Sequence, residues 1–176
     1  NTHYGFIQYG GVLYKTTDGG KTKQGGIGAP ADERNGSSDS GGEWVTPMAL
    51  NSKGDVYAAY KKLYKLVNNA WTLISTNLNV SDDIDRMEID PNEDNNIYLS
   101  ERDILFKSGD AGANFTTIIY PGGYIYGIEI SHNDSNTAWF VSSGGVYKST
   151  NILDPVPTFT NITGNLPSET KLTIKH

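Results

Sequence analysis

Short runs of alternating apolar and polar residues recur along the whole chain, and Gly, Asn, Asp and Pro lie between them. Alternation with a period of two is typical of β-strands that bury one face, and the intervening residues favour turns. No stretch sustains the 3.6-residue period of an amphipathic helix. The pattern therefore predicts an all-β fold of many short strands.

The strand pattern itself repeats, because a triplet of an apolar residue, an aromatic residue and a lysine occurs four times. The triplets end at Lys15, Lys65, Lys107 and Lys148, which lie 50, 42 and 41 residues apart. A strand-like run precedes each triplet, at residues 5–9, 56–60, 97–101 and 138–142. Further strand candidates lie before three of these runs, at 47–51, 86–90 and 127–131, and after three triplets, at 70–75, 114–119 and 158–163.

Each repeat thus holds four short strands in about 40 residues, which is typical of a β-propeller blade. A lone four-stranded sheet cannot cover its apolar faces, so blades stack on their neighbours. We predict a single propeller region over residues 1–176, with about four blades of four antiparallel strands. The blades are expected near residues 1–43, 44–80, 81–122 and 123–167, followed by an extra inner strand in 168–176.

The two ends of the chain leave two arrangements open. No strand-like run precedes residues 5–9, so the first blade is expected to lack its inner strand, and residues 171–175 form a final strand candidate. That strand either completes the first blade and closes a ring, or begins another blade of a larger propeller. The Gly/Ser-rich segment 23–42 is expected to combine a poor fourth strand with a long exposed loop.

Two turns carry an Asp, a Gly and similar polar residues at the same spacing, between the expected third and fourth strands of their blades. Their side chains can accept and donate hydrogen bonds within a tight turn, and the glycine suits a positive φ. We interpret both turns as structural elements and exclude their aspartates from catalysis. The residues are Thr16, Asp18, Gly20 and Thr22 in the first repeat, and Ser108, Asp110, Gly112, Asn114 and Phe115 in the third.

The turn pattern resembles the Asp-box, or BNR repeat, of sialidase and sortilin-type propellers. Longer stretches, such as "RMEIDPNEDNNIYLS" and "FTNITGNLP", resemble blades of sortilin-like (VPS10-type) propellers in large secreted proteins of Bacteroidota. The resemblance implies an extracellular place at the bacterial cell surface, after export by the type IX system. It implies little about activity, since such propellers include glycosidases, adhesins, receptors and assembly factors.

Composition and charge exclude several classes of function. Hydrophobic residues make up 36% and charged residues 19%, with a net charge of −6. An acidic chain is poorly suited to nucleic acids, whose binding needs Lys and Arg to neutralise phosphates. The chain has no cysteine, hence no disulfide and no thiolate zinc site. No apolar run is long enough to span a membrane.

Catalysis finds weak support in the sequence. A sialidase needs an arginine cluster, but the three arginines are scattered at Arg34, Arg86 and Arg102. A glycoside hydrolase of the xyloglucanase type needs two carboxylates facing each other across a cleft. The inner strands offer Glu88, Asp90 and Glu129, but single carboxylates at strand edges are usually solvated. We expect no catalytic activity.

Two further sets of residues could bind ligands. Asp90, Asn92, Asp94 and Glu101 have the spacing of an EF-hand-like calcium loop, although residues 97–101 also form a strand candidate and Asp-Pro-Asn favours a tight turn. We expect no cofactor, with Ca²⁺ as the alternative. Exposed tyrosines in the loop between the third and fourth blades could stack on sugars or on a protein, or pack between the blades instead. They are Tyr120, Tyr124 and Tyr126.

These observations favour a non-catalytic extracellular propeller module that binds or scaffolds, with a polysaccharide or a protein as its ligand. One alternative is a fragment of a sortilin-like glycoside hydrolase. Another is a structural subunit of a surface filament, in which copies of the chain associate by adding a strand to each other's sheets.

Overall fold

A computed structural model describes residues 2–7, 11–36, 41–78, 80–167 and 174. Its fifteen strands form four antiparallel sheets in chain order. The strands are β1 (His3–Ile7), β2 (Val12–Thr16) and β3 (Gln24–Ile27); β4 (Met48–Leu50), β5 (Val56–Ala59), β6 (Leu63–Val67) and β7 (Ala70–Leu73); β8 (Arg86–Ile89), β9 (Ile97–Glu101), β10 (Ile104–Ser108) and β11 (Thr116–Ile118); and β12 (Ile125–Ser131), β13 (Asp134–Ser142), β14 (Gly145–Ser149) and β15 (Thr160–Asn161).

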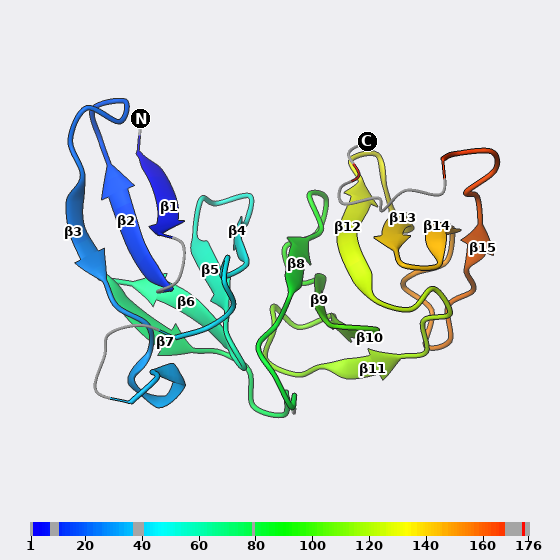
Figure 1. Cartoon of the computed structure of the whole chain (residues 1–176), viewed down its shortest axis with the longest axis horizontal. Helices are drawn as coiled ribbons and strands as arrows, with labels where there is room; N and C mark the ends of the chain where they lie inside the picture. Colours follow the sequence, from blue (N-terminus) through cyan, green and yellow to red (C-terminus); the bar gives the residue numbers. More distant parts are fainter. Residues whose placement is uncertain (1, 8–10, 37–40, 79, 168–173, 175–176) are drawn as a thin grey trace.

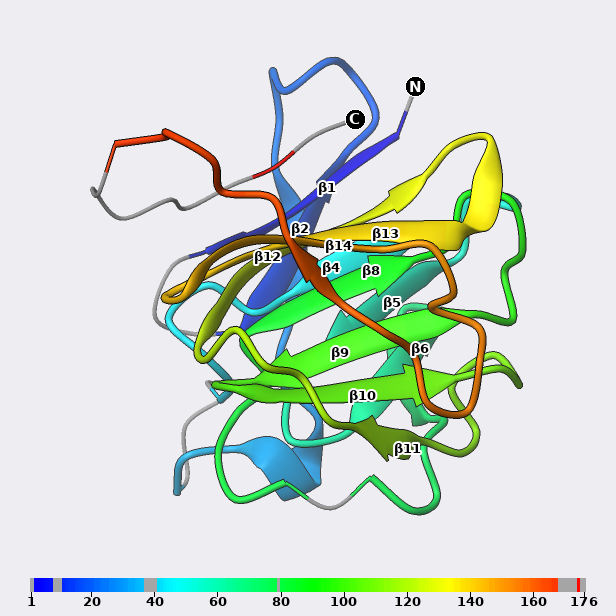
Figure 2. The same ribbon diagram turned by 90° about the vertical axis from the view of Figure 1, so that its right-hand side faces the viewer.

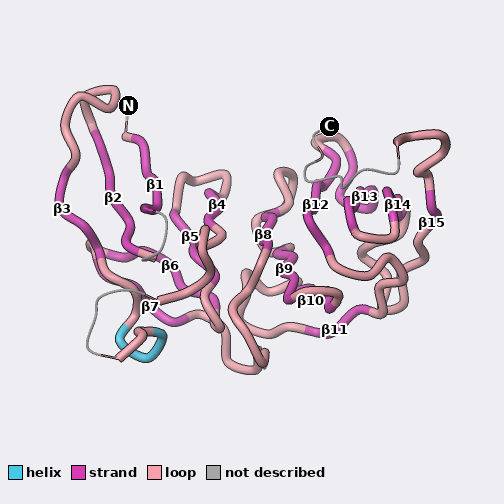
Figure 3. Tube along the Cα trace, viewed as in Figure 1, coloured by secondary structure: helices cyan, strands magenta, loops and turns pink. Residues whose placement is uncertain are grey.

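The predicted all-β propeller architecture is confirmed. Figure 1 shows the four sheets following one another along an arc, with β1–β3 at one end and β12–β15 at the other. In Figure 2, β8, β9, β10 and β11 run side by side in that order, as a meander requires. Figure 3 colours as helix a short segment near β7, which is the single turn of 3₁₀-helix η1 (Ala31–Glu33) among the described residues. Within these residues no helix is long and apolar enough to cross a membrane.

The first blade has three strands among the described residues. The fourth strand that the sequence predicts at residues 171–175 falls outside the described part of the chain, apart from Ile174. Whether that strand closes a ring or begins another blade therefore stays a prediction.

The repeated triplets lie on the third strands β6, β10 and β14 of the last three blades and on β2 of the first blade. Their side chains alternate between the two faces of the strand. Phe106 pairs across the sheet with Leu99, and the next residue, Lys107, pairs with Tyr98. Because successive side chains of a strand point to opposite faces, Tyr64, Phe106 and Tyr147 face the preceding blade. The lysine faces the other way, and Lys107 contacts the following blade. The triplet is thus a two-sided packing unit, which explains why it recurs.

Three apolar clusters join the four blades. Between the second and third blades, Tyr57 and Leu63 pack with Leu99 and Phe106. Between the third and fourth blades the cluster includes Tyr98, Leu105 and Phe140. Burial of these faces provides the main stabilisation of each sheet, since burying apolar area contributes roughly 25 cal/mol per Å².

The first and second blades meet through aromatic rings. The Phe6 ring stacks on Trp71 with centroids 6.2 Å apart and planes inclined by 14°. The Tyr60 ring meets Phe6 edge to face, and the Tyr60 hydroxyl donates a hydrogen bond of 2.7 Å to the Gly11 carbonyl. These contacts attach the three described strands of the first blade to the second blade.

The segment after β2 is only partly the exposed loop that the sequence predicts. Its η1 turn folds back on the second blade, where the Tyr64 hydroxyl lies 2.9 Å from an oxygen of Asp32 and 3.1 Å from an oxygen of Glu33. Glu33 is 8% exposed and Ala29 is 1% exposed. Polar and apolar contacts with β6 therefore hold part of this insertion in place.

Candidate functional site

A hollow of about 580 Å³ lies where the inner strands of the second, third and fourth blades begin. Each of these blades contributes the residues that enter its first strand, so the repeat brings three loops to one place. The lining residues are Glu43, Trp44, Val45, Pro47 and Met48 before and within β4, Asp85, Arg86 and Met87 at the start of β8, and Tyr124 before β12.

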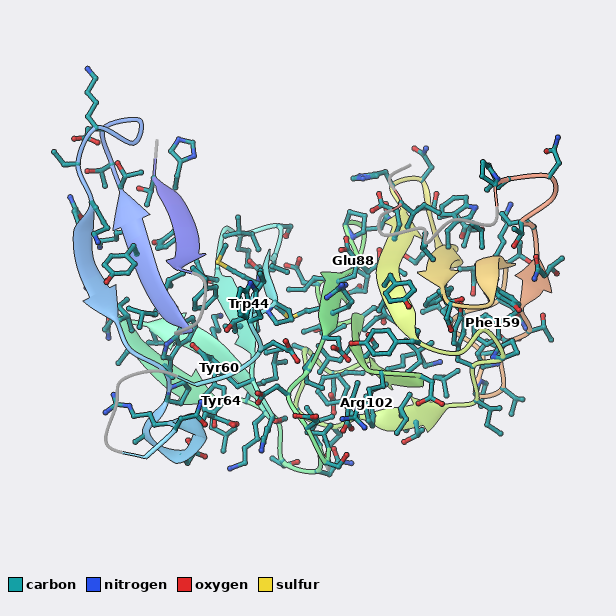
Figure 4. All side chains as sticks on the ribbon, viewed as in Figure 1. Trp44, Tyr60, Tyr64, Glu88, Arg102 and Phe159 are labelled. Carbon is teal, nitrogen blue, oxygen red and sulfur yellow. The ribbon has the colours of Figure 1, made fainter. Side chains whose placement is uncertain are left out.

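Large apolar side chains are exposed at this hollow. Trp44 is 46% exposed and Val45 is 63% exposed. Figure 4 labels Trp44 beside the second blade, and Glu88 marks the neighbouring strand β8. A concave surface that combines an open aromatic ring with a few fixed polar groups is typical of ligand sites.

Asp85 fixes the polar wall of the hollow. Its side chain is 6% exposed, and its two oxygens accept hydrogen bonds of 2.5 Å from the Tyr124 hydroxyl and the Arg102 backbone N–H. Burial, followed by this hydrogen bond to Asp85, raises the pKa of Tyr124 to about 12. One carboxylate therefore ties together the start of β8, the β9–β10 turn and the loop before β12.

Arg86 continues this wall towards β12. Its Nε donates to the Tyr126 carbonyl at 2.6 Å, and its Nη1 donates to the Asp85 carbonyl at 2.5 Å. The rings of Tyr124 and Tyr126 stack at 5.1 Å with an interplanar angle of 28°. The walls are thus set by contacts within the protein, before any ligand binds.

Tyr120 does not belong to an exposed stacking surface, so this part of the sequence expectation is corrected. It is 8% exposed, and its ring packs against Phe140, Tyr147 and Phe159 at 5.3–5.6 Å between centroids. Its hydroxyl donates to Ser142 Oγ at 2.9 Å. The ring fills space between the third and fourth blades, which leaves Tyr124 as the predicted tyrosine that lines the hollow.

Two further carboxylates, Asp82 and Asp83, lie in the loop that precedes β8. Burial raises the pKa of Asp83, and the nearby carboxylates of Asp82, Glu43 and Asp85 raise it further, against a lowering effect of Lys61. Glu43 Oε2 accepts a 2.8 Å hydrogen bond from the backbone N–H of the next residue, Trp44. Asp83 therefore lies within electrostatic range of two carboxylates that line the hollow, Glu43 and Asp85.

The three carboxylates predicted as weak catalytic candidates lie outside the lining of the hollow. Asp90 is fully buried and Glu129 is 1% exposed, so neither is open to a polymeric substrate. Glu88 is half-buried on β8, beside the inner edge of its blade (Figure 4). The structure does not bring these residues together as an accessible pair.

The residues with calcium-loop spacing also have other roles. Asp90 Oδ1 accepts from the backbone N–H and the side-chain amide of Asn92, which closes the turn after β8. Asp94 reaches the second blade and accepts from Ser52 N and Oγ at 2.7 and 2.8 Å. Glu101 Oε1 accepts a 3.0 Å hydrogen bond from the Ser81 backbone N–H. Across the described ranges, no cluster of three or more His, Asp or Glu residues could hold a metal ion.

The two aspartate turns share one hydrogen-bond pattern. Asp110 Oδ1 accepts from Ser108 Oγ and from the Asn114 backbone N–H, both at 2.8 Å. Asp18 makes the corresponding bonds to Thr16 and Thr22 at 2.7 and 2.9 Å. These turns follow third strands, and the hollow lies where first strands begin, so antiparallel order places the turns at the opposite end of each blade.

Several residues of the hollow were not singled out by the sequence. Glu43, Trp44 and Val45 follow the glycine-rich insertion, and no periodic pattern separates an exposed tryptophan from a core one. Asp85 lies in an acidic stretch that resembles a solvated loop, and Arg86 is one of three arginines scattered along the sequence. These residues lie together because the inner strands of three neighbouring blades begin at the same place.

No protein-family model and no curated protein matches the chain. Solved structures do. An ancestral GH74 enzyme is similar over 94% of this chain, with 18% identity and a TM-score of 0.68. The GH74 xyloglucanase from Xanthomonas campestris is similar over 81%, with 19% identity and a TM-score of 0.57. YCF48 from Cyanidioschyzon merolae is similar over 88%, with 15% identity and a TM-score of 0.58.

At these identities the similarity shows the β-propeller fold alone. The chain spans 23% of the ancestral GH74 enzyme, 24% of the xyloglucanase and 52% of YCF48. The repeated four-stranded blade is what all of these chains share with it.

Proposed function

We propose that this chain is a non-catalytic β-propeller module that binds a polysaccharide in the hollow at Trp44. The exposed Trp44 ring beside the fixed polar groups of Asp85 and Arg86 is the observation that carries this proposal. Sugar rings present apolar C–H faces that stack on tryptophan, and polar groups in fixed positions can orient the sugar hydroxyls. The fixed wall limits the entropy that binding would cost.

The proposed setting is the extracellular surface of a bacterium. Its support is the resemblance of the turns at Asp18 and Asp110, and of the blade sequences, to sortilin-like propellers of secreted proteins. A protein ligand is the other partner class that the sequence allows. We favour a polysaccharide because the hollow combines an open aromatic ring with hydrogen-bonding groups.

A second candidate function is that of a glycoside hydrolase fragment. The propeller neighbours that include GH74 enzymes favour it. Against it, Asp90 and Glu129 are buried, whereas hydrolysis needs two carboxylates that reach the glycosidic bond from opposite sides. The filament alternative depends on a strand at residues 171–175, which lie outside the described residues apart from Ile174.

Calorimetric titration of the chain with xyloglucan and cellohexaose tests the proposal. Trp44→Ala should weaken binding by at least about tenfold, or ~1.4 kcal/mol, because it removes the stacking surface. Ile119→Ala is the control, since Ile119 is 90% exposed and lies outside the hollow. Equal affinity of Trp44→Ala and wild type would contradict the proposal.

A reducing-end assay on the same samples separates binding from hydrolysis. We expect no release of sugar ends by the wild-type chain. Steady release would favour the hydrolase alternative and would contradict the non-catalytic proposal.

A further inference from the structure

Two very exposed apolar side chains lie together at the outer rim, between the third and fourth blades. Ile119, next to β11, is 90% exposed, and Val156, in the β14–β15 connection, is 79% exposed. Both line one small hollow, although they are far apart in the sequence. Exposed apolar side chains that gather at one place mark a contact surface for another molecule.

The wall formed by the β14–β15 connection is fixed within the protein. Lys107 holds three successive carbonyls just before Pro155. Just after Pro157, the Thr158 backbone N–H donates to Asn151 Oδ1 at 2.9 Å. The two prolines restrict the backbone further, because their rings fix φ. The hollow is therefore shaped before anything binds to it.

The size of the hollow indicates a protein side chain as its occupant. Sites for small molecules commonly enclose roughly 300–1,000 Å³, whereas this hollow has about 170 Å³. Its lining carries no charged side chain and consists of Thr117, Ile118, Ile119, Pro155, Val156 and Pro157. These properties suit one apolar side chain of another chain.

The charge pattern favours a second copy of the same chain as the source of that side chain. The net charge of −6 makes two copies repel each other at long range. The longest stretch without Asp, Glu, Lys or Arg is residues 111–128, and residues 155–168 lack these types up to Glu169. These two stretches supply the whole lining of the hollow. Two copies can therefore meet at this surface without bringing like charges into contact.

The surface also carries both halves of a self-complementary contact. The exposed Ile119 side chain lies beside a hollow that suits an apolar side chain, and in a two-fold symmetric contact one surface serves both copies. Strand β11 is the outer strand of its sheet (Figure 2). Soluble proteins commonly protect such edges with charges or prolines, and β11 has neither.

We propose that the chain forms a two-fold symmetric dimer through this rim surface, with Ile119 of each copy inserted into the hollow of the other. A contact of this kind is small and therefore weak, with a dissociation constant between roughly 10 μM and 1 mM. It shares no residue with the lining of the hollow at Trp44. The dimer therefore does not depend on the proposed function.

Sedimentation velocity over a range from ~1 μM to ~1 mM tests the proposal. The wild-type chain should change from monomer to dimer across this range. Dimerisation should strengthen in ~0.5 M salt, where the Debye length is on the order of 4 Å, because salt screens the repulsion between acidic copies.

Ile119→Glu should weaken dimerisation by at least about tenfold, because it places a carboxylate in an apolar hollow. Leu73→Glu is the matched control. Leu73 lies on β7, the outer strand of the second blade, is 47% exposed and is outside the rim hollow. It adds the same charge and should leave the dissociation constant unchanged.

Cross-linking locates the contact, since the chain has no cysteine of its own. A mixture of Ile119→Cys and Val156→Cys copies should form a disulfide-linked pair when a mild oxidant is added, whereas a mixture of Leu73→Cys and Val156→Cys copies should not. A wild-type chain that stays monomeric over the whole concentration range would overturn the proposal. A dimer that survives Ile119→Glu, or equal losses in both glutamate variants, would overturn it as well.

Discussion

At the scale of single residues, the geometry of the turn at Asp110 restricts which residues can occupy it. Asp110 accepts hydrogen bonds from both sides of its turn, and Ala111 and Gly112 have φ values of 58° and 88°. A Cβ on Gly112 would collide with the Leu63 side chain of the second blade. Gly112 is therefore required by its backbone conformation and by the close approach of the neighbouring blade.

The fourth blade keeps this turn with a different residue. Asn151 Oδ1 accepts from the Thr158 backbone N–H at 2.9 Å and from Ser149 Oγ at 3.3 Å. Its amide donates to Asp154. A neutral oxygen in the aspartate position is thus compatible with the blade.

Because Asn151 takes the place of the aspartate in the fourth blade, we expect the turn at Asp110 to tolerate asparagine better than alanine. Asp110→Ala removes the acceptor for Ser108 and Asn114 and should lower the free energy of unfolding by about 1–3 kcal/mol. Asp110→Asn keeps one oxygen and should cost less than half of that. Urea denaturation of the two variants measures the difference. An equal loss in both would show that charge, and not acceptor geometry, holds the turn.

The difference in stability between wild type and Asp110→Asn should also depend on pH. Hydrogen bonds from Asn114, followed by the bond from Ser108, lower the pKa of Asp110. A depressed carboxyl pKa contributes stability above the unfolded value of about 3.9, and this contribution is lost as pH falls through the folded value. The stability gap between wild type and Asp110→Asn should therefore narrow below about pH 4.

At the scale of elements, lysine on the third strand connects one blade to the next. Lys107 Nζ on β10 donates to the carbonyls of Ile152, Leu153 and Asp154 at 3.1, 2.9 and 2.7 Å. Burial lowers the pKa of this lysine. The ammonium group thus satisfies three successive carbonyls of the β14–β15 connection.

Lys107→Met should therefore loosen the connection that follows β14. We expect a loss of about 2 kcal/mol in unfolding free energy, because three carbonyls lose a charged donor. Hydrogen exchange should accelerate at the Ile152 amide, which donates to the Asn136 carbonyl.

Lys148→Met is the matched control, since Lys148 has the same strand position in the next blade and its Nζ lies 5.5 Å from the Trp139 ring centroid. It should cost no more than about 1 kcal/mol. A similar loss in both variants would argue that the carbonyl contacts of Lys107 contribute little.

At the scale of the whole molecule, the blades depend on one another for their cores. Leu99 is fully buried in the cluster between the second and third blades. In such an array, stability is shared between neighbouring repeats and their interfaces.

Leu99→Ala should therefore destabilise two blades at once, by about 3 kcal/mol for a fully buried leucine. Hydrogen exchange would report faster opening in both β4–β7 and β8–β11. Val156→Ala, at a site that is 79% exposed, should change stability by less than about 0.5 kcal/mol. Faster exchange confined to β8–β11 would contradict the coupling between blades.

Much of the fold follows from sequence because the repeat is local. The triplets at Lys65, Lys107 and Lys148 lie on third strands, and the runs before them lie on second strands. In the first blade the triplet at Lys15 lies on β2, and the run before it overlaps β1. The predicted strand limits differ from the structure by a few residues, as at β1 and β13, because frayed ends and pairing partners set the limits. The insertion after β2 was less predictable, since its η1 turn depends on distant contacts with Tyr64.

The candidate site was much less predictable than the fold. An aromatic residue in a loop between blades indicates a ligand surface only in general terms. This pattern predicts Tyr124, which lines the hollow, but it equally predicts Tyr120, which is buried in the core. Asp85 and Trp44 carry no local pattern. Their role depends on how three inner strands converge, which involves residues about 40 positions apart along the chain.

By itself, the sequence determined the all-β repeat, the turns at Asp18 and Asp110, and the acidic net charge. These properties depend on backbone periodicity, turn chemistry and charge, which act over a few residues or over the whole composition. Only the tertiary structure decided which polar and aromatic residues lie together. Burial between blades hides Asp90, Glu129 and Tyr120, whereas convergence of three loops exposes Trp44 beside Glu43.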